Sequence, residues 1–358
     1  MSWLLLMVLV LIVFSYLYLR GEDLSYLDSN VIPRPTGDPS EAHHVVVASL
    51  KEMANAGGGS MFGKSRIAAV RQHMDSISDG RDFTSEFRPV DKGRVRGEWV
   101  LAPGSNPRRR LLYIHGGAFM AGSPKSHRSV TNKLSQVADA AVFSLDYRLL
   151  PEHKRIDGIE DCQIAYQWLL ANGPDGPEEL DFLAVAGDSA GGNLTLAVIA
   201  WARDEGLRAA DAAIAFSPAT EGSLTSPSWV GNMATDPMLA PAFGKLTRVP
   251  LILLWWGSWL TARIRPADPR VSPVRGNLAG LPPVLVQASE AEMLFDDARR
   301  YVAKAQAAGS PVELQSWPHM VHVWQIFTPE LPEANDAYDN IGEFLATVEG
   351  QTVDAVTS

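Results

Sequence analysis

Short apolar runs and longer amphipathic segments follow one another along most of this chain. The apolar runs have the length of strands, and the segments between them have the three-to-four-residue spacing of helices. The predicted strands are residues 94–101, 110–114, 141–145, 180–186, 212–216, 283–288 and 312–317. The predicted helices among them are residues 128–138, 158–171, 189–205, 293–308 and 333–349. This alternation indicates an α/β fold, with a mostly parallel central sheet and helices on both faces.

The start of the chain has a different pattern, because residues 3–19 are almost entirely apolar. Their number is at the short end of what a membrane-spanning helix needs. A cleaved signal segment is the alternative, but no basic residue precedes the run and no small-residue cleavage site follows it. The tyrosines near its end and Arg20 after it are typical of interfacial anchors. We therefore predict that residues 1–20 form a single N-terminal membrane anchor, without assigning the side of the membrane.

Residues 21–90 are polar and irregular. Helical spacing occurs at 41–54 and 65–78, and the glycine-rich run at 57–60 indicates a mobile linker or loop. Two helices are too few to make a domain of their own. We expect them to pack over another part of the protein.

A second irregular interval covers residues 218–270 and contains the apolar, tryptophan-rich run 249–260. This run is too short to span a membrane. The favoured interpretation is a buried helix of an inserted cap. The alternative is a helix whose aromatic face contacts the bilayer or a lipid substrate.

Composition excludes several classes of protein. The net charge of −10, without any basic stripe, argues against nucleic acid as a partner. The one cysteine, Cys162, excludes an internal disulfide and a thiolate zinc cluster, and its helical surroundings predict a buried thiol. Glycines at 116 and 117 follow the predicted strand 110–114, but they do not form the G-x-G-x-x-G pattern of a dinucleotide-binding site. We predict no metal and no organic cofactor.

A candidate nucleophile lies between the predicted strand 180–186 and the helix that follows it. Ser189 stands there in the pattern Gly187-x-Ser189-x-Gly191, where a strand turns sharply into a helix and presents the hydroxyl at the edge of the sheet. A serine hydroxyl needs a base to take its proton and an acid to orient that base. In a parallel sheet, these partners are expected after later strands.

Candidate acids and bases follow the last two predicted strands. Glu292 lies at the strand-to-helix turn after residues 283–288, whereas Asp296 and Asp297 fall in the first helical turns, where surface positions are expected. His319 and His322 both follow residues 312–317.

The strand 110–114 is followed by a histidine and two glycines, Gly116 and Gly117. Glycines let a ligand oxygen approach the backbone N–H groups closely. Together with the N–H of Ala190, they predict an oxyanion hole.

In this order, the segments resemble the hormone-sensitive-lipase-like esterase/lipase branch of the α/β-hydrolase superfamily. The resemblance covers residues 94–349 and is carried by segments 115–118, 146–153, 187–193, 268–273, 292–297 and 320–322. It implies an α/β-hydrolase fold with a helical cap. It also implies Ser189 as nucleophile, His322 as base and Glu292 as acid, with the N–H groups of Gly116, Gly117 and Ala190 as the oxyanion hole. Ala118 departs from the family, which commonly has glycine there.

The resemblance also divides the chain. The predicted parts are the anchor at 1–20, the N-terminal helical part of the cap at 21–90, the catalytic domain at 91–217 and 271–350, and the inserted cap segment at 218–270.

The predicted function is a serine carboxylic-ester hydrolase that acts through an acyl-enzyme on short- to medium-chain acyl esters. The substrate would be a small-molecule or lipid ester, and a homodimer is one candidate assembly. One alternative is an amide or lipid-ester hydrolase similar to arylacetamide deacetylases. A more remote alternative is a non-catalytic ligand receptor on the same fold.

Overall fold

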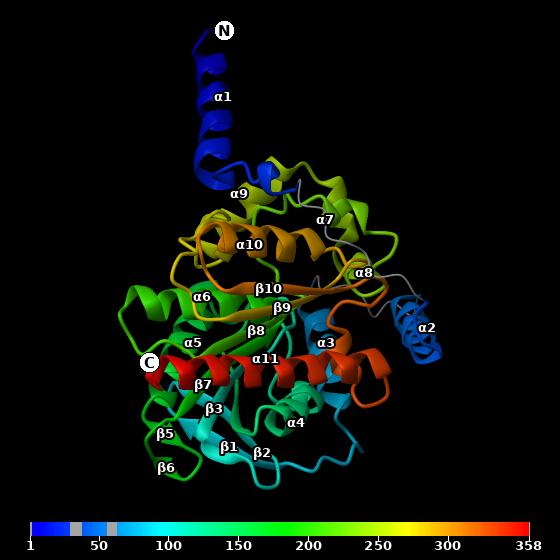
Figure 1. The fold of residues 1–358 in the computed structure, drawn as a ribbon. Helices are drawn as coiled ribbons and strands as arrows, with labels where there is room; N and C mark the ends of the chain where they lie inside the picture. Colours follow the sequence, from blue (N-terminus) through cyan, green and yellow to red (C-terminus); the bar gives the residue numbers. More distant parts are fainter. Residues whose placement is uncertain (1, 29–37, 56–62, 358) are drawn as a thin grey trace.

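The computed structural model describes residues 2–28, 38–55 and 63–357. Its centre is an eight-stranded sheet with the strand order β1-β2-β4-β3-β7-β8-β9-β10 (Figure 1). From β4 to β10 neighbouring strands are parallel, whereas β2 pairs antiparallel with β1 and with β4. The bounds are β1 (Glu86–Lys92), β2 (Val95–Leu101), β3 (Asn106–Ile114), β4 (Ala140–Leu145), β7 (Phe182–Asp188), β8 (Ala212–Phe216), β9 (Val284–Ser289) and β10 (Val312–Trp317). The predicted α/β class with a mostly parallel central sheet is therefore confirmed.

Helices cover both faces of the sheet, as predicted. On one face, α4 (Arg128–Val137) and α11 (Pro332–Thr357) form one hydrophobic core with the strands. On the other face, α5 (Arg155–Leu169), α6 (Ala190–Asp204) and α10 (Phe295–Ala307) form a second core. Central strands such as β4 and β8 are buried along their whole length, which explains their unbroken apolar runs. The thiol of Cys162 is buried in α5, as predicted.

Two strands differ from the prediction for physical reasons. β1 begins inside the segment 21–90, which is predicted to be helical, and ends at Lys92. Most of its residues are exposed at the sheet edge, so no apolar alternation marks it. β3 begins at Asn106 rather than at residue 110. Its first half contains three arginines, so it lacks the apolar run that predicts a strand. Arg110 can be fully buried because its guanidinium donates to the carbonyl oxygens of Leu169, Glu178 and Glu179. A small hairpin of β5 (Asn172–Gly173) and β6 (Gly176–Pro177) was also not predicted.

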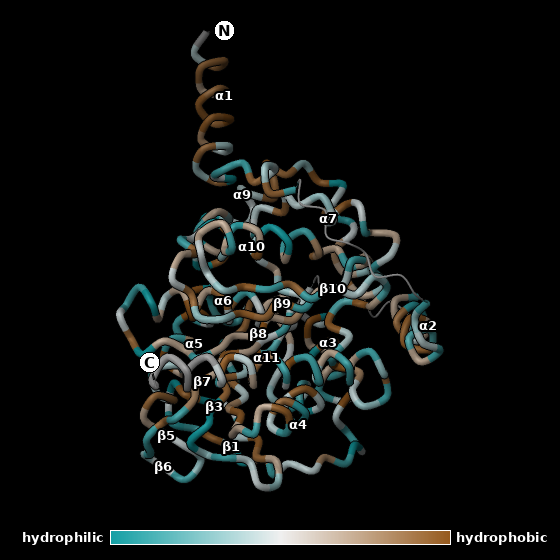
Figure 2. Tube along the Cα trace, in the orientation of Figure 1, coloured by the Kyte–Doolittle hydropathy of each residue, from teal (hydrophilic) through white to brown (hydrophobic). Residues whose placement is uncertain are grey.

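The N-terminal part begins with α1 (Ser2–Phe14) and η1 (Ser15–Arg20), which project from one end of the domain (Figure 1). Figure 2 shows α1 as a continuously hydrophobic helix. Residues Trp3–Arg20 are long and apolar enough to cross a membrane, a test that a signal sequence also passes. The short η2 (Ser25–Leu27), α2 (Glu41–Asn55) and α3 (Lys64–Ser76) follow. The predicted linker at 57–60 lies outside the described residues.

The interval 218–270 contains four short helical elements. They are α7 (Ser228–Gly231), α8 (Leu239–Phe243), η4 (Gly244–Arg248) and α9 (Leu251–Ala262). The prediction of a buried helix is wrong for α9, because Trp255 is its only buried residue. The remaining short elements are η3 (Lys125–His127), η5 (Pro273–Arg275) and η6 (Trp324–Phe327).

Candidate active site

A sharp turn between β7 and α6 presents the candidate nucleophile. Ser189 has φ 52° and ψ −113°, a strained backbone conformation for a residue with a side chain. The flanking glycines are needed for space. A Cβ on Gly191 would lie 1.8 Å from the carbonyl oxygen of Ile114, and one on Gly187 would lie 2.6 Å from the same atom. The glycines therefore let α6 start directly against the end of β3, while the serine itself carries the strain.

The loops after β9 and β10 bring the predicted acid and base to this serine. The Oγ–H of Ser189 donates to Nε2 of His322 at 2.9 Å. The Nδ1–H of His322 donates to Oε2 of Glu292 at 2.5 Å. The other oxygen of Glu292 accepts the N–H of Ser289 at 2.9 Å, which fixes the carboxylate at the end of β9. By contrast, His319 is exposed, so of the two candidate histidines the structure brings only His322 to the serine.

The surroundings of His322 set its protonation. Burial lowers the pKa of its imidazole, but the hydrogen bond and the negative charge of Glu292 outweigh that effect and raise the pKa above its ordinary value. Both side chains are almost completely buried. This arrangement stabilises the imidazolium that forms when His322 accepts the serine proton.

The backbone N–H groups near Ser189 differ from the prediction at one position. The N–H of Gly116 donates to Oδ1 of Asp188 at 2.8 Å, so it is not available to an oxyanion, and its predicted role is wrong. In the described part of the chain, the N–H groups of Gly117, Ala118 and Ala190 donate to no hydrogen bond. Ala118 was noted in the sequence as a departure from the family in this loop, but it was not among the predicted donors.

Residues 116–118 form a loop after β3, called the glycine loop below, and its backbone has an unusual conformation at two positions. Gly117 has φ +107°, and a Cβ there would lie 2.2 Å from the carbonyl oxygen of Ala121. Ala118 also has a positive φ of 54°. The helix α3 supports the loop from outside, since Arg71 donates from Nε to the carbonyl oxygen of Met120 at 2.7 Å.

Asp188 connects the glycine loop to a buried polar group beneath the serine turn. Its Oδ1 also accepts the hydroxyl of Tyr113 at 2.6 Å and lies 3.5 Å from Nε2 of His127. Burial raises the pKa of Asp188, but His127 and the hydrogen bonds lower it by more, so the pKa lies below its ordinary value. Burial lowers the pKa of the neighbouring His115 to about 3, so His115 is neutral. His127 lies just before the predicted helix 128–138, and no sequence pattern indicates this role.

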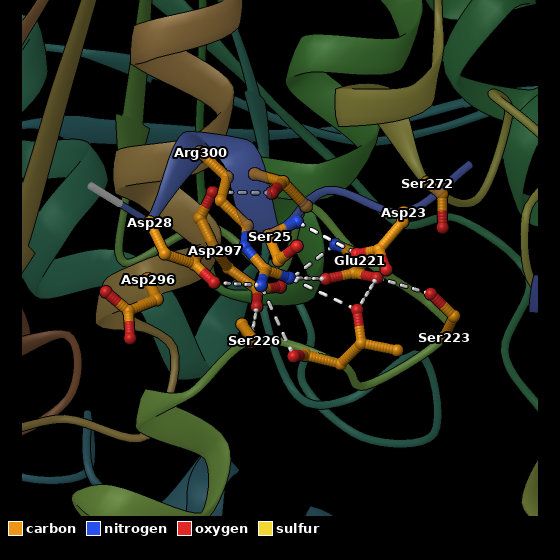
Figure 3. Close-up of polar contacts among 12 residues, drawn as sticks. Asp23, Ser25, Asp28, Glu221, Ser223, Ser226, Ser272, Asp296, Asp297 and Arg300 are labelled. Atoms are coloured by element: carbon orange, nitrogen blue, oxygen red, sulfur yellow. Dashed lines mark hydrogen bonds and ion pairs between the residues drawn. The ribbon is translucent and has the colours of Figure 1, made fainter. Parts of the chain in front are cut away.

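The two carboxylates after Glu292 are not surface charges, so that expectation is wrong for both. Asp297 is buried and accepts hydrogen bonds from the N–H of Glu221 and the hydroxyl of Ser226. Asp296 is partly buried and accepts the N–H of Ser228 at 2.8 Å. Asp297 belongs to a polar cluster around Arg300 and Glu221, whose side chains point toward one another in Figure 3.

Cap residues contact the loop that carries Glu292. The side-chain amide of Asn232 donates to the carbonyl oxygens of Glu290 and Glu292, at 2.7 and 2.8 Å. Asp236 accepts the N–H of Met293 at 2.9 Å. The cap segment therefore fixes the backbone on both sides of the acid.

A cavity of about 1130 Å³ lies between α2 and the cap residues 232–241 and reaches Glu290 and His319. No member of the group Ser189, His322 and Glu292 lines it. Among the described residues, no group of histidine, cysteine, aspartate or glutamate side chains could hold a metal ion.

Comparison with known proteins gives consistent matches. Residues 111–326 match the family described as alpha/beta hydrolase fold. The chain is 38% identical over 263 residues to an acetyl-hydrolase of Streptomyces hygroscopicus. This match covers 73% of this chain and 83% of that protein. It is 36% identical over 285 residues to the carboxylesterase/phospholipase LipF of Mycobacterium tuberculosis, covering 74% and 72%.

Solved structures give the same result. An esterase from the bacterial hormone-sensitive lipase family has a TM-score of 0.73 and 32% identity, and the match covers 86% of this chain and 98% of that one. The crystal structure of EstE5 soaked with p-nitrophenyl butyrate has a TM-score of 0.73 and 33% identity, covering 86% and 99%.

Proposed function

Since the chain belongs to the alpha/beta hydrolase family, in its hormone-sensitive-lipase-like branch, and is an ester hydrolase of the carboxylesterase/lipase type, we propose that it works through an acyl-enzyme on Ser189. The observation that carries this proposal is the continuous hydrogen-bonded chain from Ser189 through His322 to Glu292. Each of the three follows a different parallel strand, so the sheet holds them in fixed relative positions.

The reaction follows from this geometry. Nε2 of His322 takes the hydroxyl proton as Oγ of Ser189 attacks the acyl carbon, and the carbonyl π electrons move onto its oxygen. The imidazolium, held by Glu292, then gives this proton to the alcohol oxygen as the ester bond breaks. In the second half of the reaction, Nε2 of His322 takes a proton from a water molecule as the water oxygen attacks the acyl carbon. The imidazolium then gives this proton to Oγ of Ser189 as the acyl–Oγ bond breaks, which releases the carboxylic acid and regenerates Ser189.

The oxyanion of the tetrahedral intermediate is assigned to the N–H groups of Gly117, Ala118 and Ala190. Each such donor contributes about 10²–10³-fold to the rate. Asp188 has a positioning role here, because it holds Gly116 and thereby the start of the loop.

We also assign the chain to a membrane through its N-terminal helix. The support is the apolar stretch Trp3–Arg20, which is only 11% buried against the rest of the protein. The acyl group is proposed to be short to medium in length. An acetyl-hydrolase among the relatives and the p-nitrophenyl butyrate used with EstE5 support this assignment.

The test uses the purified full-length chain in detergent micelles. We expect a fluorophosphonate probe to label the wild type, and p-nitrophenyl butyrate to be hydrolysed. Ser189→Ala should abolish labelling and lower kcat by about 10⁶-fold, with an unchanged circular dichroism spectrum. Labelling or turnover by a folded Ser189→Ala chain would contradict the proposal. Flotation with liposomes tests the anchor separately.

A further inference from the structure

The helix α9 has an exposed apolar face without a protein partner in the described part of the chain. Leu253 and Leu260 are 59% and 52% exposed. They are seven residues apart and therefore lie on one side of the helix, with Gly257 between them. Trp255, the buried residue, lies on the opposite side and donates from Nε1 to the carbonyl oxygen of Ser223. The stretch 249–262 contains no charged residue.

The end of the candidate anchor packs directly beside this face. Nε1–H of Trp256 donates to Oγ of Ser15 at 2.8 Å. The ring of Phe14 lies 5.6 Å from that of Trp256 and 5.7 Å from that of Trp259. α9 therefore lies at the level where the apolar helix joins the domain, as Figure 1 shows.

The last residues of the apolar stretch, in η1, and the residues after it are fixed to the domain, so α1 and α9 keep this relation. The backbone of η1 is tied to the domain at Leu19, whose carbonyl oxygen accepts the N–H of Ala267 at 3.1 Å. Leu19 and Leu24 have no exposed surface. Further along, the carboxylate of Asp28 is held by two hydrogen bonds from the guanidinium of Arg300, at 2.7 and 2.8 Å.

Arg300 is itself part of the buried cluster in Figure 3, and it also donates to Glu221 at 2.6 Å. The nearby Arg275 donates to Glu221 and to the carbonyl oxygen of Glu22. A peptide segment held by this many charge-assisted bonds does not act as a free tether. The orientation of the domain relative to α1 is therefore set by the fold.

The ends of α9 carry basic residues. Arg248 precedes the apolar stretch, and Arg263 and Arg265 follow it. Arg265 lies over the ring of Tyr18, at 5.1 Å from its centre. An apolar helix flanked by arginines and beside interfacial tyrosines has the composition of a helix that lies in the headgroup region of an anionic leaflet.

From these observations we propose that α9 is a second membrane contact. Its Leu253–Leu260 face enters the same leaflet in which the C-terminal end of the α1 anchor lies, and its flanking arginines contact anionic headgroups. This inference rests on the membrane anchoring proposed above. It assigns the lipid leaflet, rather than a second copy of the chain, as the occupant, because the face continues the apolar surface of α1.

The experiment places a fluorophore on the full-length chain. Leu253→Cys and, separately, Leu260→Cys are labelled with an environment-sensitive nitrobenzoxadiazole dye and reconstituted into vesicles of phosphatidylcholine and phosphatidylglycerol. The control is Asp175→Cys on the β5–β6 hairpin, at the opposite end of the domain and 85% exposed at its side chain. The parent chain, whose single cysteine is buried, measures background labelling.

We expect dye at positions 253 and 260 to shift to shorter wavelength and to be quenched by lipids that carry a doxyl group near the headgroup. Dye at position 175 should show neither effect. If the chain floats with the vesicles but positions 253 and 260 behave like position 175, the inference is overturned while the anchor stands. A wavelength shift without doxyl quenching would show a protein contact instead and would also overturn it. Failure to float would overturn the anchor and this inference, but not the ester hydrolysis, which is measured in micelles.

Discussion

Two regions of the protein differ in which side chains they bury: the edge of the sheet where the loops with Ser189, Glu292 and His322 lie (the loop edge), and the end of the domain formed by α1 and α9. At the loop edge, charged and polar side chains are buried, and Glu292 and His322 are held by hydrogen bonds that compensate their loss of water. At the other end, large apolar side chains are exposed and have no such compensation in water. Buried polar groups in one region agree with the proposed chemistry, and exposed apolar groups in the other agree with the proposed membrane contact.

The largest effect is expected at the base. His322→Ala should lower kcat on p-nitrophenyl butyrate by about 10⁶-fold, because His322 is the base that accepts from Ser189 among the described residues. His319→Ala is the matched control and should remain close to wild type, since that side chain is exposed. If His319→Ala alone removed activity, the assignment of the base would be wrong.

Removing the charge of the acid should have the next largest effect. Glu292→Gln should lower kcat/KM by about 10⁴-fold, because the imidazolium loses its carboxylate partner. Since His322 must be neutral to accept a proton, activity is lost as the pH falls through its pKa. The carboxylate raises that pKa, so in the variant the acid limb of the pH profile should move to lower pH.

The pH dependence of kcat/KM, measured on the same ester, checks this prediction. Glu290→Gln is the matched control, two residues away in the same loop, and should keep the wild-type profile. An unshifted acid limb in Glu292→Gln would contradict the assigned cause of the pKa shift.

The ionic cluster that fixes the segment around Asp28 should affect stability rather than chemistry. Arg300→Met leaves Asp28 without its main partner, and among the described residues it leaves Glu221 with Arg275 as its remaining cationic partner. We expect the free energy of unfolding to fall by about 3 kcal/mol, as measured by guanidinium denaturation of the full chain in micelles. Arg108→Met removes an exposed ion pair with Asp181 and should cost less than about 1 kcal/mol. Equal losses in the two variants would show that burial of the cluster contributes nothing.

A smaller, pH-dependent effect is expected at Asp297. Burial and the nearby charge of Glu221 raise the pKa of this carboxyl to about 7. The folded chain therefore keeps a proton that the unfolded chain loses above its ordinary pKa of 3.8, and this contribution to stability is lost as the pH rises through about 7. Asp297→Asn should gain stability relative to wild type as the pH rises from about 4 to about 7, in guanidinium unfolding at each pH.

Asp296→Asn is the control for this titration, since its carboxylate accepts from Ser228 and not from the Glu221 cluster. A difference in stability between Asp297→Asn and wild type that does not change with pH would contradict the expected titration.

Much of the fold and the catalytic group could be predicted because local patterns carry them. Unbroken apolar runs identified the central strands, and the glycine spacing around Ser189 identified the turn. The predictions of strands were wrong where burial or exposure depends on residues distant in the sequence. The exposed edge strand β1 has no apolar pattern, and the buried Arg110 is tolerated only because carbonyl groups from another segment surround its guanidinium.

The sequence by itself determined the order of elements, the serine turn and the positions of acid and base after later strands, because these depend on residues close together in the chain. The tertiary structure decided which backbone N–H groups remain free, since the partner of Gly116 lies 72 positions away at Asp188. It also decided that Asp297 is buried and that α9 is exposed beside the end of the apolar N-terminal stretch. Burial and hydrogen bonding depend on what packs against a residue, and sequence patterns specify only which face is available for packing.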